Sequence, residues 1–135
     1  MKRAKAEAER WLAQAQNDLA FARLGSGEGF FAQACFVCQQ AAEKALKALR
    51  YLHGERVVIG HSVVALLDQL LADHPALRSL REAAQQLDQY YIPTRYPNGL
   101  PDGVPSDVFT RAQAEAAIAA AQRMIDLARD AIAAG

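Results

Sequence analysis

The sequence predicts an all-α protein, an up-and-down antiparallel bundle of four to five helices with a long proline-rich loop before the last helix. Apolar residues recur three and four positions apart through the long segments that lack glycine and proline, as in helices buried along one side. Much of the 52% hydrophobic content is alanine, which favours helix. The only run of three β-branched residues, 57–59, is too short to make a sheet. At 135 residues, we expect a single domain spanning 1–135.

The first two helices should form an antiparallel hairpin. The first runs from about residue 3 to residue 24 and ends at the glycines of 25–27, where Ser26 is a candidate cap for the next helix. The second runs from about residue 28 to residue 53, and Gly54 stops it. This second helix is the central one, since it has a continuous apolar stripe. The stripe consists of Phe31, Ala34, Cys35, Cys38, Ala41, Ala42, Ala45, Leu46, Leu49 and Leu52.

Two shorter helices should follow an apolar connector at 55–60. The third helix starts near His61 and Ser62 and carries leucines at helical spacing up to residue 71. Pro75 begins the fourth helix, because proline suits the first helical position. That helix ends around 90–91.

The segment 92–109 is predicted to be a loop. It holds four of the five prolines of the chain and two glycines, a spacing that no long helix tolerates. A connection of this length is uncommon in a compact domain and is often functional. The last helix then opens with Thr110 and Gln113, which match a capping box. Its apolar residues alternate three and four apart, so it should pack lengthwise on the hairpin or on a second subunit.

Composition argues against several classes of function. The formal net charge is zero, so there is no global electrostatic case for nucleic acid, although a small basic patch is possible. No apolar run is long enough for a membrane span, and the basic N-terminus lacks the apolar stretch of a signal peptide. Cys35 and Cys38 lie one turn apart on the core stripe, without a second cysteine pair. We therefore expect reduced, buried thiols, a cytoplasmic setting, and no metal or cofactor.

The polar face of the second helix is the first candidate site. Gln40, Glu43, Lys44 and Lys47 crowd into two turns, with Glu43 and Lys47 in the favourable order for an ion pair. These residues fit a solvated face with a weak surface pair. The alternative is a cleft wall that binds an anion, such as a nucleotide or an RNA phosphate.

The second candidate site lies around the end of the fourth helix. Three tyrosines and Arg95 fall within 90–96, a composition that suits phosphate contact and base stacking, a protein–protein hot spot, or plugging of the bundle end. His61, at a predicted helix start, could cap that helix or act as a general acid or base. Arg56 and His61 also match, weakly, the R-x(4–6)-H pattern of some metal-independent RNases.

These residues together resemble the HEPN domain family, and more narrowly its small stand-alone prokaryotic members. The resemblance rests on the QQAAEKALKAL sequence at 39–49, a histidine opening the next helix, and the RYP sequence at 95–97. It covers nearly the whole chain. It implies a helical bundle, a homodimer, and a minimal nucleotidyltransferase protein as partner in a toxin–antitoxin-like pair. The positions that match the family pattern are Gln40, Glu43, Lys44, Lys47, His61, Arg95 and Tyr96.

Three functions remain in competition. The first, which we favour, is a nucleotide- or RNA-binding module without chemistry of its own. The second is a metal-independent RNase that uses His61 with Arg56 or Arg95. The third is a purely structural dimerisation domain built on the seam of the last helix. The sequence names neither the ligand nor the partner.

Overall fold

The computed structural model describes residues 2–135, and every regular element in that range is helical. The long helices are α1 (Lys2–Gly27), α2 (Phe31–Leu52) and α6 (Arg111–Ala134). The shorter α-helices are α3 (Val63–Leu70), α4 (Arg81–Asp88) and α5 (Pro105–Val108). Two 3₁₀ turns complete the set: η1 (Pro75–Leu80) and η2 (Pro97–Gly99).

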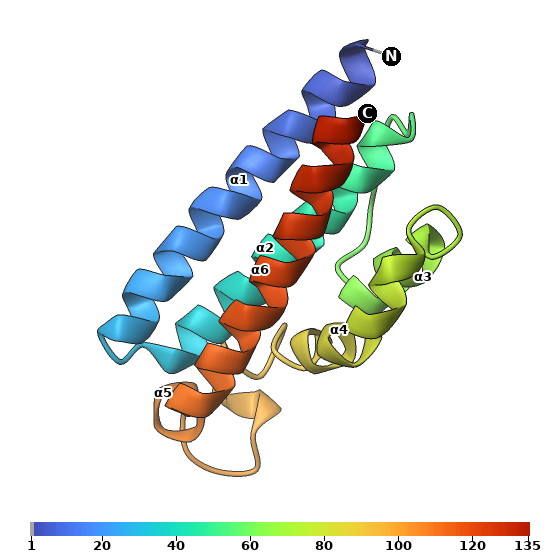
Figure 1. Cartoon of the computed structure of the whole chain (residues 1–135). Helices are drawn as coiled ribbons and strands as arrows, with labels where there is room; N and C mark the ends of the chain where they lie inside the picture. The colour runs from blue at the N-terminus through green and yellow to red at the C-terminus, as the bar shows by residue number, and fades with distance from the viewer. Residues whose placement is uncertain (1) are drawn as a thin grey trace.

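The three long helices form the body of the molecule (Figure 1). α1 and α2 make an antiparallel hairpin, and α6 lies along it, packed mainly on α2 and less on α1. α3 and α4 pack together as a pair to one side of this body, where both contact α2. The two ends of the chain lie at the same end of the bundle, opposite α5. The bundle is the predicted fold.

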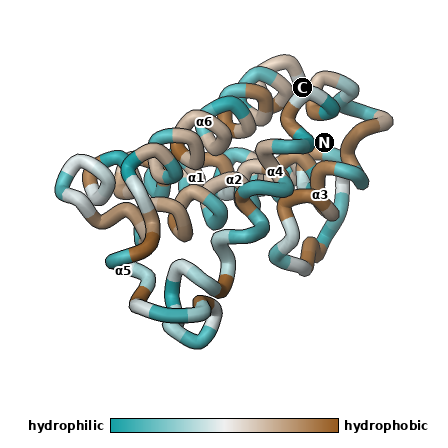
Figure 2. The backbone as a smooth tube through the Cα atoms, turned by 90° about the horizontal axis from the view of Figure 1, so that it is seen from below, coloured by the Kyte–Doolittle hydropathy of each residue, from teal (hydrophilic) through white to brown (hydrophobic). Residues whose placement is uncertain are grey.

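The core runs between the long helices and under the α3–α4 pair. Alanines at the helix contacts let the backbones approach closely, while leucines and isoleucines fill the wider spaces. Figure 2 shows the hydrophobic residues gathered where helices face one another, and a mostly hydrophilic 92–109 segment outside them. The largest fully buried apolar side chains are Leu46, Leu49, Leu67, Leu70, Leu77, Leu87, Met124 and Ile125.

The turn of the hairpin lies later than the sequence predicts. α1 continues through the glycines of 25–27, and α2 begins at Phe31 rather than near residue 28. The turn is made by Gly29, whose φ of 90° is the left-handed conformation that glycine adopts without strain. Ser26 is buried and lies inside α1, so its predicted capping role was wrong; the residue before α2 is Phe30, without a side-chain cap.

The predicted fourth helix is two elements. Pro75 starts it as expected, but residues 75–80 form the 3₁₀ turn η1, and the α-helical part begins only at Arg81. Leu80 separates them with a φ of −101° and a ψ of 2°, which departs from helical geometry. α4 then ends at Asp88, and Tyr90 and Tyr91 lie in the following turn.

The segment 92–109 is largely irregular, with only η2 and the single turn of α5 in it. α6 follows with the predicted capping box, in which the Thr110 side chain accepts from the Gln113 amide and the Gln113 side chain accepts from the Thr110 amide. The apolar seam of α6 is buried against the hairpin of the same chain. A dimer therefore needs a surface other than this seam.

Among residues 2–135, the structure contains no helix that combines the length and the apolar character of a membrane span.

Candidate functional site

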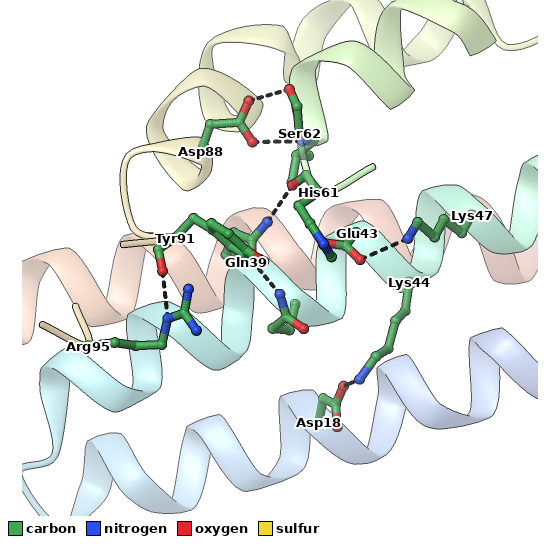
Figure 3. Close-up of polar contacts among 12 residues, drawn as sticks. Asp18, Gln39, Glu43, Lys44, Lys47, His61, Ser62, Asp88, Tyr91 and Arg95 are labelled. Atoms are coloured by element: carbon green, nitrogen blue, oxygen red, sulfur yellow. Dashed lines mark hydrogen bonds and ion pairs between the residues drawn. The ribbon is translucent and has the colours of Figure 1, made fainter. Parts of the chain in front are cut away.

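A buried carboxylate, Glu43, lies at the centre of the polar network on α2. Its side chain is only 5% exposed. One oxygen, Oε2, lies 3.0 Å from Lys47 Nζ, and the other, Oε1, lies 3.1 Å from His61 Nδ1 (Figure 3). Glu43 thus links two basic side chains from two segments of the chain, the middle of α2 and the start of α3.

Lys47 is as deeply buried as Glu43, with 7% of its side chain exposed. Its ammonium lies 5.8 Å from the centre of the Trp11 ring on α1, which adds a cation–π contact to the ion pair. Trp11 in turn stacks on Tyr51, with ring centres 5.2 Å apart. A buried charge is tolerated only when it is paired, so Lys47 and Glu43 hold each other in place under this aromatic cover.

Gln39 fixes the backbone at His61. Its side chain is fully buried, and its amide nitrogen donates to the His61 carbonyl oxygen over 2.8 Å. Gln40 supports it by donating to the Gln39 side-chain oxygen over 2.7 Å. Gln39 was not predicted from the sequence, although the signal was present: Gln39, Glu43 and Lys47 are spaced by four and therefore share one helix face.

Asp88, at the end of α4, holds the start of α3. Its carboxylate accepts from the Ser62 hydroxyl over 2.8 Å and from the backbone amides of Val63 and Val64 over 2.6 and 3.3 Å. Those amides are free donors at a helix N-terminus, where a carboxylate is the preferred partner. The Ser62 oxygen also accepts from the Ala65 amide, so the residue next to His61 is tied from both sides.

Tyr91 connects His61 to Arg95. Its ring stacks on the His61 imidazole with centres 5.0 Å apart and planes 19° apart. The Arg95 guanidinium carbon lies 4.7 Å from the centre of the same tyrosine ring. Arg95 Nε also donates a hydrogen bond to the Tyr91 carbonyl oxygen over 2.8 Å. Figure 3 shows Tyr91 between the side chains of His61 and Arg95. In the sequence, His61 precedes the 62–90 segment and Arg95 follows it.

Two further aromatic rings surround the Arg95 guanidinium. Phe36 on α2 lies 4.5 Å from its central carbon, and Tyr96 lies 5.2 Å from it. Arg95 is exposed, as is half of Tyr96. Arg95 forms no ion pair with a carboxylate in residues 2–135, so its charge faces solvent from an aromatic cage.

His61, Arg95 and Tyr96 therefore lie together, with Gln40, Glu43 and Lys47 behind or beside them. We call the buried residues Gln39, Glu43 and Lys47 the anchor. We call the outward residues His61, Tyr91, Arg95 and Tyr96 the contact surface. Glu43 and Lys47 cancel in charge, which leaves Arg95 as the permanent cation of the contact surface.

Lys44 turns to the other side of α2. Its ammonium lies 2.6 Å from an Asp18 carboxylate oxygen on α1, and three-quarters of its side chain is covered. The i+1 position after Glu43 points about 100° around the helix, which explains the divergence. Lys44 thus joins α1 to α2 rather than the contact surface.

Arg56 and His61 are not brought together. Arg56 lines a groove of ≈ 670 Å³ with Arg3, Glu7 and Tyr51, at the end of α2. The connector then runs back along α2, so that His61 reaches Glu43, about 13 Å along the helix axis from Leu52. The R-x(4–6)-H spacing at 56–61 consequently does not form a paired arginine and histidine in this structure.

The two cysteines are buried and unbonded. Burial raises the pKa of both the Cys35 and the Cys38 thiol to about 12, so neither is a thiolate at neutral pH. Within residues 2–135, no three side chains of the metal-ligating types histidine, cysteine, aspartate and glutamate gather as a metal site.

The HEPN domain profile matches residues 8–131, which include the anchor and the contact surface. This chain belongs to the HEPN domain family. Three solved structures are similar to it. The first, TT1696 from Thermus thermophilus, has 44% identity and a TM-score of 0.87, and the match covers 92% of this chain and 97% of that one. ST0689, an archaeal HEPN homologue, has 35% identity and a TM-score of 0.77, with 93% and 98% covered.

The third structure is an HEPN domain protein from Thermotoga maritima, with 31% identity and a TM-score of 0.72, and the match covers 92% of this chain and 98% of that one. A comparison with curated proteins found no match. The HEPN assignment, predicted from the sequence, is confirmed, and it supports a nucleotide- or RNA-related module in general terms.

Proposed function

We propose that this HEPN protein binds a nucleotide or an RNA phosphate at the contact surface, and that the anchor holds that surface in place without touching the ligand. The observation that supports this most is the set of aromatic contacts around Arg95, because a guanidinium exposed among rings combines phosphate binding with a stacking platform. Tyr96, half exposed beside it, offers a face on which a base stacks.

His61 supplies the second polar contact. The Glu43 carboxylate accepts a hydrogen bond from His61 Nδ1. The proton of the neutral ring therefore resides on Nδ1, and the Nε2 lone pair faces outward. Nε2 makes no hydrogen bond to residues 2–135, and 59% of the side chain is exposed. Nε2 thus offers an acceptor beside Arg95, on the other side of Tyr91, which suits a hydroxyl or amino group of a nucleotide whose phosphate binds Arg95.

Binding is tested by fluorescence anisotropy with a short labelled single-stranded RNA and with ATP as competitor. Arg95→Ala should weaken RNA binding at least about tenfold, since one phosphate contact and one stacking partner are lost together. Lys44→Ala is the matched control, because it removes one positive charge that Asp18 already neutralises. Equal affinities for wild type and Arg95→Ala would refute the proposed ligand surface.

A metal-independent RNase is the second candidate, favoured by one observation: the Glu43–His61 contact resembles the carboxylate–imidazole pairs that orient a general base. Arg95, rather than Arg56, is the arginine that shares a ring contact with this histidine. Incubation of the purified protein with RNA in EDTA separates the two candidates. Cleavage that His61→Ala abolishes would establish the RNase, and intact RNA that is nevertheless bound would leave the binding module.

The HEPN resemblance also supports a homodimer and a minimal nucleotidyltransferase protein as partner. Phe21, Leu24 and Phe30 are each more than half exposed around a cavity of ≈ 340 Å³ where α1 meets α2, and they offer an apolar surface for a second copy. Light scattering should give a dimer for the wild type and a monomer for Leu24→Asp; a wild-type monomer would remove the homodimer. Co-purification with a nucleotidyltransferase encoded beside the gene tests the other partner.

A further inference from the structure

Two histidines outside the contact surface converge on each other. His53 follows the last residue of α2, and His74 precedes η1. Their Nε2 atoms lie 2.7 Å apart, and their ring centres 4.9 Å apart with planes inclined by 46°. This pair lies about 15 Å along α2 from Glu43, so it is separate from the contact surface.

The surroundings of the pair favour a bound cation. His74 is half-buried, and its Nε2 atom faces the Nε2 atom of His53. The carboxylate of the adjoining Asp73 is close enough to act electrostatically on His74, and it adds negative potential at this position. Arg50, the nearest cation on α2, is engaged by Glu55 and Gln69.

We propose that His53 and His74 bind one divalent late first-row transition metal ion, such as zinc or nickel, through their Nε2 atoms. Imidazole nitrogens are the ligands that these ions prefer among neutral side chains. Two nitrogens on a tetrahedral zinc ion lie about 3.3 Å apart, so the rings must separate by roughly half an ångström. The exposed His53 side chain has room for that rotation.

The ion uses two protein ligands, and water completes its coordination, since no third ligand-type side chain in residues 2–135 gathers with this pair. The ligands are 21 residues apart in sequence. A bound ion would join the end of α2 to the residue before η1, and so link the hairpin to the α3–α4 pair. Because the unfolded chain does not hold these two rings together, the ion should stabilise the folded state.

The three histidines of the chain provide a matched set of variants. Zinc chloride or nickel chloride is titrated by calorimetry into the full chain without a histidine tag, at neutral pH, for wild type, His53→Ala, His74→Ala and His61→Ala. Thermal unfolding is followed with and without the same ion. Wild type and His61→Ala should bind one ion per chain and gain in melting temperature. His53→Ala and His74→Ala should bind at least about tenfold more weakly and gain little.

Two results would overturn the proposal. Absence of binding by the wild type would leave a pair of histidines that share one proton by hydrogen bonding alone. Equal binding by all four proteins, or loss of binding in His61→Ala only, would place any ion elsewhere. Circular dichroism of each variant excludes misfolding, and His53→Gln, which keeps a polar side chain at the helix end, serves if His53→Ala does not fold.

Discussion

The anchor and the contact surface are adjacent, but the physical forces that hold them differ. In the anchor, Gln39, Glu43 and Lys47 are almost fully buried, and each polar group has a partner. In the contact surface, His61, Arg95 and Tyr96 are exposed, and stacking on Tyr91 and Phe36 positions the two basic side chains. The first region therefore contributes to stability, whereas the second keeps donors and rings available.

This difference separates two roles that the sequence pattern joins. Glu43 and Lys47 match the family pattern as strongly as Arg95 does, yet only Arg95 has its charge free for a ligand. A motif residue that is buried and paired serves to position its neighbours. The contrast predicts that anchor variants lose stability first and contact-surface variants lose binding alone.

The largest effect is expected for Glu43→Ala. It leaves the buried Lys47 ammonium without a carboxylate, and breaking one partner of a buried pair costs about 3 to 5 kcal/mol. Urea unfolding measures the loss. The double variant Glu43→Leu with Lys47→Met removes both charges and should lose less than Glu43→Ala alone. If Glu43→Ala unfolds at the wild-type urea concentration, the anchor does not stabilise the fold.

Asp88→Ala should have an intermediate effect. It removes the acceptor of two amides and one hydroxyl at the start of α3, a change comparable to the loss of a helix cap at about 1 to 2 kcal/mol. Because the same contacts hold Ser62 beside His61, RNA affinity should fall as well. The control is Glu82→Ala on the exposed side of α4. A variant that keeps both stability and affinity would show that α3 starts correctly without Asp88.

The smallest effect concerns pH. Burial and the nearby His53 lower the pKa of His74, so the unfolded state binds the proton more tightly than the folded state. Stability should thus fall as pH decreases through the ordinary histidine value near 6.5 and level off below the folded pKa. Unfolding curves at several pH values should show a shallower decline for His74→Asn than for wild type. Identical declines of stability with pH in the two proteins would mean that folding does not lower the pKa of His74.

The sequence predicted the bundle well because its signals are local. Helical periodicity, the Thr110–Gln113 capping box and the start at Pro75 each depend on residues within one or two turns. The ends of α1 and α2 were less predictable, because Gly25 and Gly27 continue a helix when tertiary packing compensates for their flexibility.

The site was predictable only in part, for the opposite reason. His61, Glu43 and Arg95 are visible as motif residues, but the side chains that position them come from distant segments. Asp88 accepts a hydrogen bond from the backbone amide of Val63, which is 25 residues away in the sequence. Asp18 on α1 binds Lys44 on α2. No spacing rule relates such residues, so the sequence could not show that Lys44 faces α1 or that Arg56 is remote from His61.

The most direct test of the account is the protonation state of the His61 ring. We propose that Glu43 of the anchor holds His61 by accepting a hydrogen bond from its Nδ1 atom, which leaves Nε2 free for a ligand. Nitrogen-15 chemical shifts of the His61 imidazole, recorded where the ring is neutral, should show the proton on Nδ1 in wild type. That preference should be lost in Glu43→Ala. A wild-type ring protonated mainly on Nε2 would contradict the account, because Nδ1 would then have no proton to donate to Glu43.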